Sequence, residues 1–222
     1  MREAVMIPGP PVLEGVYESP DSVIRGSAVI AHPHSLRGGT MVQPVVHHVA
    51  KACRRMGLAT VRFNFRGVGL SQGEFSGMDE WEDVRAAADM VTQRAAVDGP
   101  MVLAGYSFGA RMSALAALKD VRADALILVA FPMLWEDLTP DAFDRLGEFT
   151  GPVLSICGLQ DDIAPPAEVE AFFHQRGLQP ETVVISGTDH FFHGRHGPLE
   201  AAVESFLLRC LPTEEASGER KV

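Results

Sequence analysis

A serine between two glycines is the residue of this sequence best placed to act as a nucleophile. Residues 105–109 read GYSFG, directly after an apolar run at 101–104 that predicts a strand, and a helical pattern begins at about Phe108. A tight strand-to-helix turn leaves no room for side chains at the two glycines, and the helix N-terminus favours negative charge beside it. The pattern predicts that Ser107 attacks an ester-like carbonyl; the alternative is a glycine-rich helix cap with an idle serine.

One of the eight histidines, His190, is placed to be the general base that a weakly nucleophilic hydroxyl needs. It lies in the loop after the last predicted strand, at 183–185. His193 and His196 are nearby competitors, but each lies further towards the last predicted helix. We therefore expect His190 to be the base, against the alternative of a solvent-exposed loop histidine.

Two adjacent aspartates, Asp161 and Asp162, follow the predicted strand at 153–157. A catalytic histidine needs a carboxylate that fixes its tautomer and stabilises the imidazolium. We expect Asp161 to have this role and Asp162 to be a solvated neighbour or loop cap.

Acyl transfer also needs donors for the oxyanion of the intermediate. The backbone N–H of Phe108, just after the nucleophile, is the first candidate. The second is expected from the loop at 32–39, where Pro33 has no N–H, so we choose the backbone of His34, with Ser35 as the alternative.

These residues need a scaffold of strands that alternate with helices. Buried strands separated by helical patterns predict an α/β fold with a mostly parallel eight-stranded sheet, an antiparallel N-terminal edge and helices on both faces. Ligands of such sheets bind beyond the carboxyl ends of the strands, where the candidate residues lie. We expect one domain at 1–211 and a polar tail at 212–222. The predicted strands are 4–7, 12–17, 28–31, 60–65, 101–104, 125–130, 153–157 and 183–185; the predicted helices lie at 42–56, 81–95, 108–118, from 166, and from about 199 to 210.

Composition narrows the class of partner. The net charge of −10 disfavours nucleic acid and anionic membranes, no apolar stretch approaches the roughly 20 residues of a membrane helix, and the N-terminus lacks the apolar core of a signal peptide. Three widely spaced cysteines favour a reducing cytoplasm over a disulfide framework. We expect a small-molecule substrate and no cofactor; a homodimer is compatible with the sequence, which leaves the oligomeric state open.

Together these motifs resemble the α/β-hydrolase superfamily, and more narrowly its small, lidless bacterial serine hydrolases of the dienelactone-hydrolase-like and uncharacterised groups. The resemblance spans nearly the whole chain. It implies the roles given above for Ser107, Asp161 and His190, which follow one another in the chain order of that fold. The motifs that carry it are HPHSLRGGTM, RFNFRGVGLSQGEF, GYSFGA, GLQDDIAPP and GTDHFFHGR.

The segment after the predicted strand at 125–130 is too short for the helical lid of larger family members. An open site favours small or accessible substrates. Its apolar side chains either line an acyl pocket or pack in the core; we assign Phe131, Met133 and Trp135, together with Ser35, to the substrate pocket.

Two other sequence patterns suggest metal or nucleotide binding. The histidines of the HxxHxxH pattern at 190–196 could bind zinc, but the segment contains glycine and is predicted to be a loop, so no metal is expected. The segment GVGLSQG at 67–73 lacks the lysine and serine of a nucleotide loop and is predicted to be a turn.

Three functions remain compatible with the residues. The first is a carboxylesterase-type hydrolase with an acyl-enzyme intermediate. The second keeps the same three residues but acts on a thioester, amide, lactone or epoxide. The third is a non-enzymatic small-molecule binding module on a hydrolase scaffold.

Overall fold

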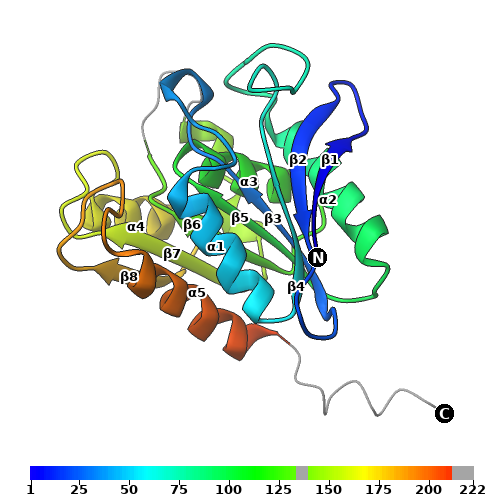
Figure 1. The fold of residues 1–222 in the computed structure, drawn as a ribbon. Coiled ribbons are helices and arrows are strands. Elements are labelled where there is room, and N and C mark those ends of the chain that lie inside the picture. Colours follow the sequence, from blue (N-terminus) through cyan, green and yellow to red (C-terminus); the bar gives the residue numbers. More distant parts are fainter. Residues whose placement is uncertain (134–139, 212–222) are drawn as a thin grey trace.

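The computed structural model describes residues 1–133 and 140–211, so the tail predicted at 212–222 and the predicted pocket residue Trp135 lie outside the described residues. An eight-stranded sheet runs through the described part, with helices on both faces (Figure 1). This is the α/β class that the sequence predicts.

The sheet has the strand order β1-β2-β4-β3-β5-β6-β7-β8. β1 pairs antiparallel with β2, and β2 pairs antiparallel with β4, which confirms the predicted antiparallel edge. The remaining neighbours pair in parallel. The strands are β1 (Arg2–Ile7), β2 (Leu13–Glu18), β3 (Gly26–Ala31), β4 (Leu58–Phe63), β5 (Met101–Tyr106), β6 (Ala125–Val129), β7 (Val153–Gly158) and β8 (Glu181–Ile185).

The helices cover the two faces of the sheet in pairs. α1 (Pro44–Arg55) packs against α5 (His196–Cys210) on one face, and α2 (Trp81–Ala95) contacts α3 (Phe108–Leu118) on the other (Figure 1). α4 (Pro166–Gln175) lies near β7 and β8. The connection between β6 and β7 contains the short 3-10 helices η2 (Pro140–Phe143) and η3 (Leu146–Glu148), and η1 (Ser35–Arg37) follows β3. Within the described residues, no helix combines the length and the apolar character that crossing a membrane requires.

Three sequence predictions about these elements are corrected by the structure. α1 begins at Pro44 rather than at Val42, because proline is favoured in the first helical turn, and Val42 is 65% exposed. β4 lies two residues earlier than predicted. Trp81, expected on the buried stripe of α2, is only partly buried at the first position of the helix, where Arg85 stacks over its ring.

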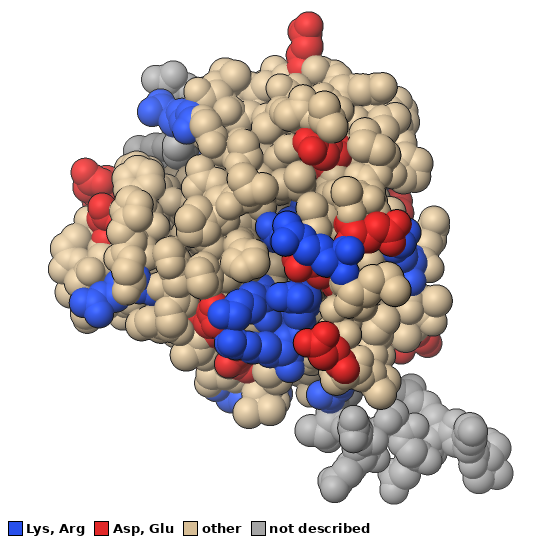
Figure 2. Space-filling view, in the orientation of Figure 1, with Lys and Arg blue, Asp and Glu red and all other residues tan. Residues whose placement is uncertain are grey.

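The seam between α1 and α5 is held by charged side chains. The carboxylate of Glu200 on α5 accepts hydrogen bonds from Lys51 (3.0 Å) and Arg55 (2.7 Å) and contacts the His48 ring nitrogen, all on α1. Burial raises the pKa of Glu200, but the hydrogen bonds from His48 and Lys51 outweigh it and hold the pKa at about 2. Figure 2 shows Lys and Arg side chains with acidic neighbours over this region. The seam joins the two helices whose preceding loops carry His34 and His190.

Candidate active site

Ser107 lies in a sharp turn between β5 and α3, with a positive φ of 55° that non-glycine residues rarely adopt. The flanking glycines make this turn possible. A Cβ added at Gly105 would lie 2.1 Å from the carbonyl oxygen of Gly109, and one added at Gly109 would lie 2.4 Å from that of Ala31. The side chain of Ser107 is thereby presented at the carboxyl end of the central strand, at the start of a helix.

In the folded chain, His190 lies between Ser107 and Asp161, which are 54 positions apart in the sequence. The Nε2 atom of His190 is 3.0 Å from the Ser107 hydroxyl, and its Nδ1 atom is 2.9 Å from Oδ2 and 3.0 Å from Oδ1 of Asp161. All three side chains are nearly buried, with 2–4% of each residue exposed. The structure therefore brings together the three residues that the sequence predicts.

The carboxylate of Asp161 is fixed by backbone groups of its own loop. Its Oδ1 atom accepts hydrogen bonds from the N–H groups of Ile163 (3.0 Å) and Ala164 (2.8 Å). Asp162 is exposed, as expected for the solvated neighbour. Of the two aspartates, only Asp161 contacts His190 within the described residues.

Tyr106 supports the His190 loop in a way that sequence reasoning missed. Its hydroxyl donates a hydrogen bond of 2.9 Å to the backbone carbonyl of His190. Burial raises the pKa of the Tyr106 phenol well above its usual range, so the group stays a donor at neutral pH. A tyrosine at the end of a buried strand signals a polar partner, but only the fold shows that the partner is the loop after β8.

The loop after β3 lies against the start of α3. The ring of His34 contacts the rings of Phe75 and Phe108, at centroid distances of 4.8 and 5.2 Å. Phe108 begins α3, so its N–H belongs to the first turn, whose N–H groups have no partner within the helix. Both predicted oxyanion donors are thus in segments beside Ser107.

A hollow of about 300 Å³ opens beside Ser107. Ile163 (40% exposed) and Phe191 (51% exposed) give it apolar walls, and each is a near neighbour of a predicted site residue, Asp161 or His190. That proximity in the chain is the signal from which both could have been proposed. The lining residues are Pro33, His34, Arg37, Gln43, Tyr106, Ser107, Ile163, His190 and Phe191.

Of the predicted pocket residues, the three that the structure describes do not line this hollow. Phe131 is fully buried and packs against Phe143, Phe172 and Phe173, because these three aromatic side chains meet behind the carboxyl end of β6. Met133 is also buried and belongs to the core. Ser35 is partly buried, and in the described part of the chain it is not among the residues that line the hollow.

The competing histidines point to other neighbours. His193 stacks on Phe191, and His196 stacks on His48 of α1 at a centroid distance of 4.4 Å. Across residues 1–133 and 140–211, no three His, Cys, Asp or Glu side chains are grouped so as to hold a metal ion.

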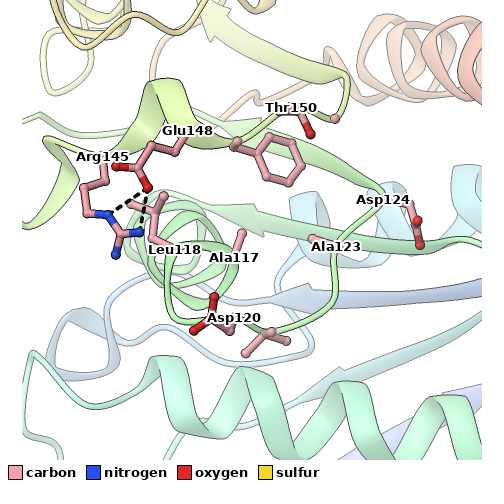
Figure 3. A pocket seen from close by; sticks show the side chains of 11 residues that line it. Ala117, Leu118, Asp120, Ala123, Asp124, Arg145, Glu148 and Thr150 are labelled. Atoms are coloured by element: carbon pink, nitrogen blue, oxygen red, sulfur yellow. Dashed lines mark hydrogen bonds and ion pairs between the residues drawn. The ribbon is translucent and has the colours of Figure 1, made fainter.

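Another hollow, of about 340 Å³, lies between the end of α3 and the segments that precede β6 and β7 (Figure 3). It is therefore at the amino ends of these strands, opposite to Ser107. Figure 3 shows the ion pair of Arg145 and Glu148 at its edge, 2.6 Å apart. Its described lining residues include no serine, cysteine or histidine, so they do not form a serine–histidine or cysteine–histidine pair.

Similarity to known proteins agrees with this arrangement. A model of the alpha/beta hydrolase domain matches residues 26–201. The solved structure of an alpha-beta serine hydrolase homologue from Coxiella burnetii has a TM-score of 0.83 and 40% sequence identity to this chain, and the match covers 91% of this chain and 96% of that one. XC6422 from Xanthomonas campestris, described as a member of the a/b serine hydrolases without a lid, has a TM-score of 0.82 and 33% identity over 96% of each chain.

Among curated proteins, an uncharacterised protein of Rickettsia prowazekii is 27% identical over 202 residues, which are 88% of this chain and 84% of the relative. The domain match extends over well more than half of the chain, and both solved structures share the fold over more than nine-tenths of it. Hydrolase activity is the activity that these likenesses support. The chain belongs to the α/β-hydrolase superfamily.

Proposed function

We propose that the chain is a carboxylesterase-type serine hydrolase that cleaves a small or accessible carboxylic ester through an acyl-enzyme. The observation that carries the proposal is the continuous hydrogen-bonded series from Ser107 through His190 to Asp161. These side chains follow β5, β8 and β7, so three separate crossovers of the fold converge on one point. Such an arrangement meets the geometric requirement for an activated serine.

In the proposed reaction, His190 takes the proton of Ser107 as the hydroxyl oxygen attacks the ester carbonyl. Asp161 holds the proton on Nδ1 of His190, which leaves Nε2 free to act as the base. The protonated His190 then gives its proton to the departing alkoxide, and the acyl group stays on Ser107. A water molecule, deprotonated by His190, attacks the acyl-enzyme; the bond to the Ser107 oxygen breaks, His190 returns the proton to that oxygen, and the acid is released.

The negative charge on the attacked carbonyl oxygen needs hydrogen-bond donors on the side away from the base. We assign this role to the backbone N–H groups of Phe108 and His34. Donors held by the backbone are already oriented before the reaction, so they stabilise the developing charge without rearrangement.

The open hollow beside Ser107 supports the proposal that the substrate is a small molecule. Its volume of about 300 Å³ is at the lower end of ligand pockets, and Ile163 and Phe191 offer apolar contact to an acyl or alcohol group. The same three residues could attack a thioester, amide, lactone or epoxide, which a substrate panel separates. All three cysteines are free, which fits a reducing compartment, and we propose the cytoplasm.

The test is Ser107→Ala, assayed with short-chain p-nitrophenyl esters. We expect kcat to fall by about 10⁴-fold or more while the folded structure persists. Ser113→Ala is the matched control, because Ser113 lies on the same helix with its hydroxyl bonded to the Ala104 carbonyl, and it should keep kcat within about 2-fold. Wild-type turnover in Ser107→Ala would refute the mechanism. Well-folded protein that hydrolyses no member of the panel would favour the binding module.

A further inference from the structure

His32 follows β3 directly and is fully buried, yet neither the proposed reaction nor the substrate hollow uses its side chain. Both ring nitrogens have backbone partners. The Phe65 N–H donates to Nε2 at 3.0 Å, and Nδ1 lies 2.6 Å from the carbonyl oxygen of Pro33. Since Nε2 accepts, the ring proton is on Nδ1, which donates to that carbonyl. Burial lowers the pKa of His32 to about 4, so this neutral form holds at neutral pH.

The Pro33 carbonyl belongs to the same peptide unit as the His34 N–H. A trans peptide is planar, so its C=O and N–H point in opposite directions and turn together. Gly39 also lies against this carbonyl, since an added Cβ there would be 2.0 Å from the Pro33 oxygen. Gly39 also donates its N–H to the His34 carbonyl at 3.0 Å. The orientation of this peptide is therefore fixed by His32 and Gly39.

We propose that His32 is a positioning residue: by holding the Pro33 carbonyl, it sets the direction of the His34 N–H towards the oxyanion. It does so without touching the substrate. The inference rests on the proposed function, in which His34 supplies the second backbone donor. The hydrogen bond from Phe65, two residues beyond the end of β4, ties His32 to the segment that follows the strand next to β3.

Two substitutions separate the two hydrogen bonds of His32. His32→Asn places an amide N–H near the position of Nδ1, so it keeps the donor to Pro33 and gives up the acceptor for Phe65. His32→Gln reaches the position of Nε2, so it keeps an acceptor for Phe65 and gives up the donor to Pro33. A role in packing alone predicts similar effects for both variants, whereas the positioning role predicts that they differ.

The expected readout is a change in kcat rather than in KM. Removal of an oxyanion donor costs about 10²–10³-fold in kcat, so a misdirected donor in His32→Gln should cost about 10- to 100-fold. KM should stay within about 2-fold, and His32→Asn should keep kcat within about 3-fold of wild type. A trifluoromethyl ketone, which forms an oxyanion on the serine, should lose affinity for His32→Gln in proportion to kcat/KM.

Equal losses of kcat in the two folded variants, or no loss in His32→Gln, would overturn the proposal. If neither variant folds, Gly39→Ala perturbs the same carbonyl by direct contact and should lower kcat by a similar factor. Unchanged kcat in folded Gly39→Ala would then overturn it.

The protonation of the His32 ring can also be measured directly in the wild-type protein. Nitrogen-15 NMR of labelled histidines should show that the His32 ring is protonated on Nδ1 and does not titrate near neutral pH; a charged or Nε2-protonated His32 would refute the inference. Activity that persists in Ser107→Ala would contradict the proposed function instead, without changing the His32 tautomer, so the two failures are distinguishable.

Discussion

Replacing the carboxylate of Asp161 by an amide tests the proposed base in atomic detail. In Asp161→Asn the N–H groups of Ile163 and Ala164 continue to require an acceptor at the position of Oδ1, so the amide oxygen takes that place. The amide nitrogen is then at the position of Oδ2, 2.9 Å from Nδ1 of His190. The oxygen at the Oδ1 position, 3.0 Å from Nδ1, already accepts two backbone hydrogen bonds, and the amide nitrogen is a donor, so we expect Nδ1 to become the acceptor.

The ring proton therefore moves to Nε2, which faces Ser107 at 3.0 Å. A protonated Nε2 cannot take the serine proton. Loss of the correct tautomer in a serine–histidine–aspartate site lowers kcat by about 10⁴-fold, equivalent to about 5.5 kcal/mol of activation free energy. We expect this loss with a melting temperature close to wild type, since the substitution keeps the size of the side chain and the two backbone hydrogen bonds.

The assay is steady-state hydrolysis of p-nitrophenyl acetate at neutral pH, with thermal unfolding as the check on folding. Asp162→Asn is the matched control: it removes the same charge one residue away, on an exposed side chain, and should change kcat by less than about 2-fold. Comparable losses in the two variants, or more than a tenth of wild-type kcat in folded Asp161→Asn, would refute the tautomer reasoning.

Two further predictions concern His32 and Tyr106. The pKa of His32 is about 4 in the folded chain against 6.5 for the free side chain, so the unfolded chain binds its proton first as the pH falls. Above about pH 6.5 the residue is neutral in both states and lowers the free energy of unfolding little. Between pH 7 and pH 5 the free energy of unfolding should decrease by about 2 kcal/mol. Urea unfolding at both pH values should show a smaller decrease in His32→Asn, and an equal decrease would contradict the assignment. Tyr106→Phe removes the hydrogen bond to the His190 carbonyl and should lower the unfolding free energy by about 1 kcal/mol and kcat by about 3- to 10-fold, measured by urea unfolding and ester hydrolysis; unchanged kcat would show that this contact does not position His190.

The order of the elements and the three central site residues could be predicted because each depends on local pattern. Ser107 lies in a turn in which Gly105 is required by its contact with Gly109, four residues on, and a short apolar run predicts each neighbouring strand. The bounds of β4 are harder to predict from the sequence. Phe65 continues the apolar alternation of Val61 and Phe63, but the chain has already left the sheet, and the Asn64 side chain accepts a hydrogen bond from the Met41 N–H.

The walls of the hollow could not be predicted from local pattern, because they depend on contacts between distant segments. Phe131 resembles a pocket residue in the sequence, yet it meets aromatic side chains of η2 and α4 and joins the core. Conversely, Phe191 and Ile163 resemble exposed loop residues, and the fold places both at the substrate hollow. Apolar character alone does not distinguish these cases.

The three histidines of the pattern at 190–196 show the same limit. Their even spacing suggests a shared ligand, but α5 begins at His196, and the turn of the chain before it sends the side chains to different partners. His190 contacts Ser107, whereas His196 lies against α1. The distinction depends on where the helix begins, which is the least predictable feature of an element.

The most direct test of the central claim is covalent labelling of the folded protein by a fluorophosphonate probe, followed by intact-mass measurement and peptide mapping. An activated Ser107 predicts one added probe per chain, located on Ser107, with labelling abolished in Ser107→Ala and retained in Ser113→Ala. Failure of the folded wild-type protein to be labelled, or a label on another residue, would contradict the assignment of Ser107 as the nucleophile.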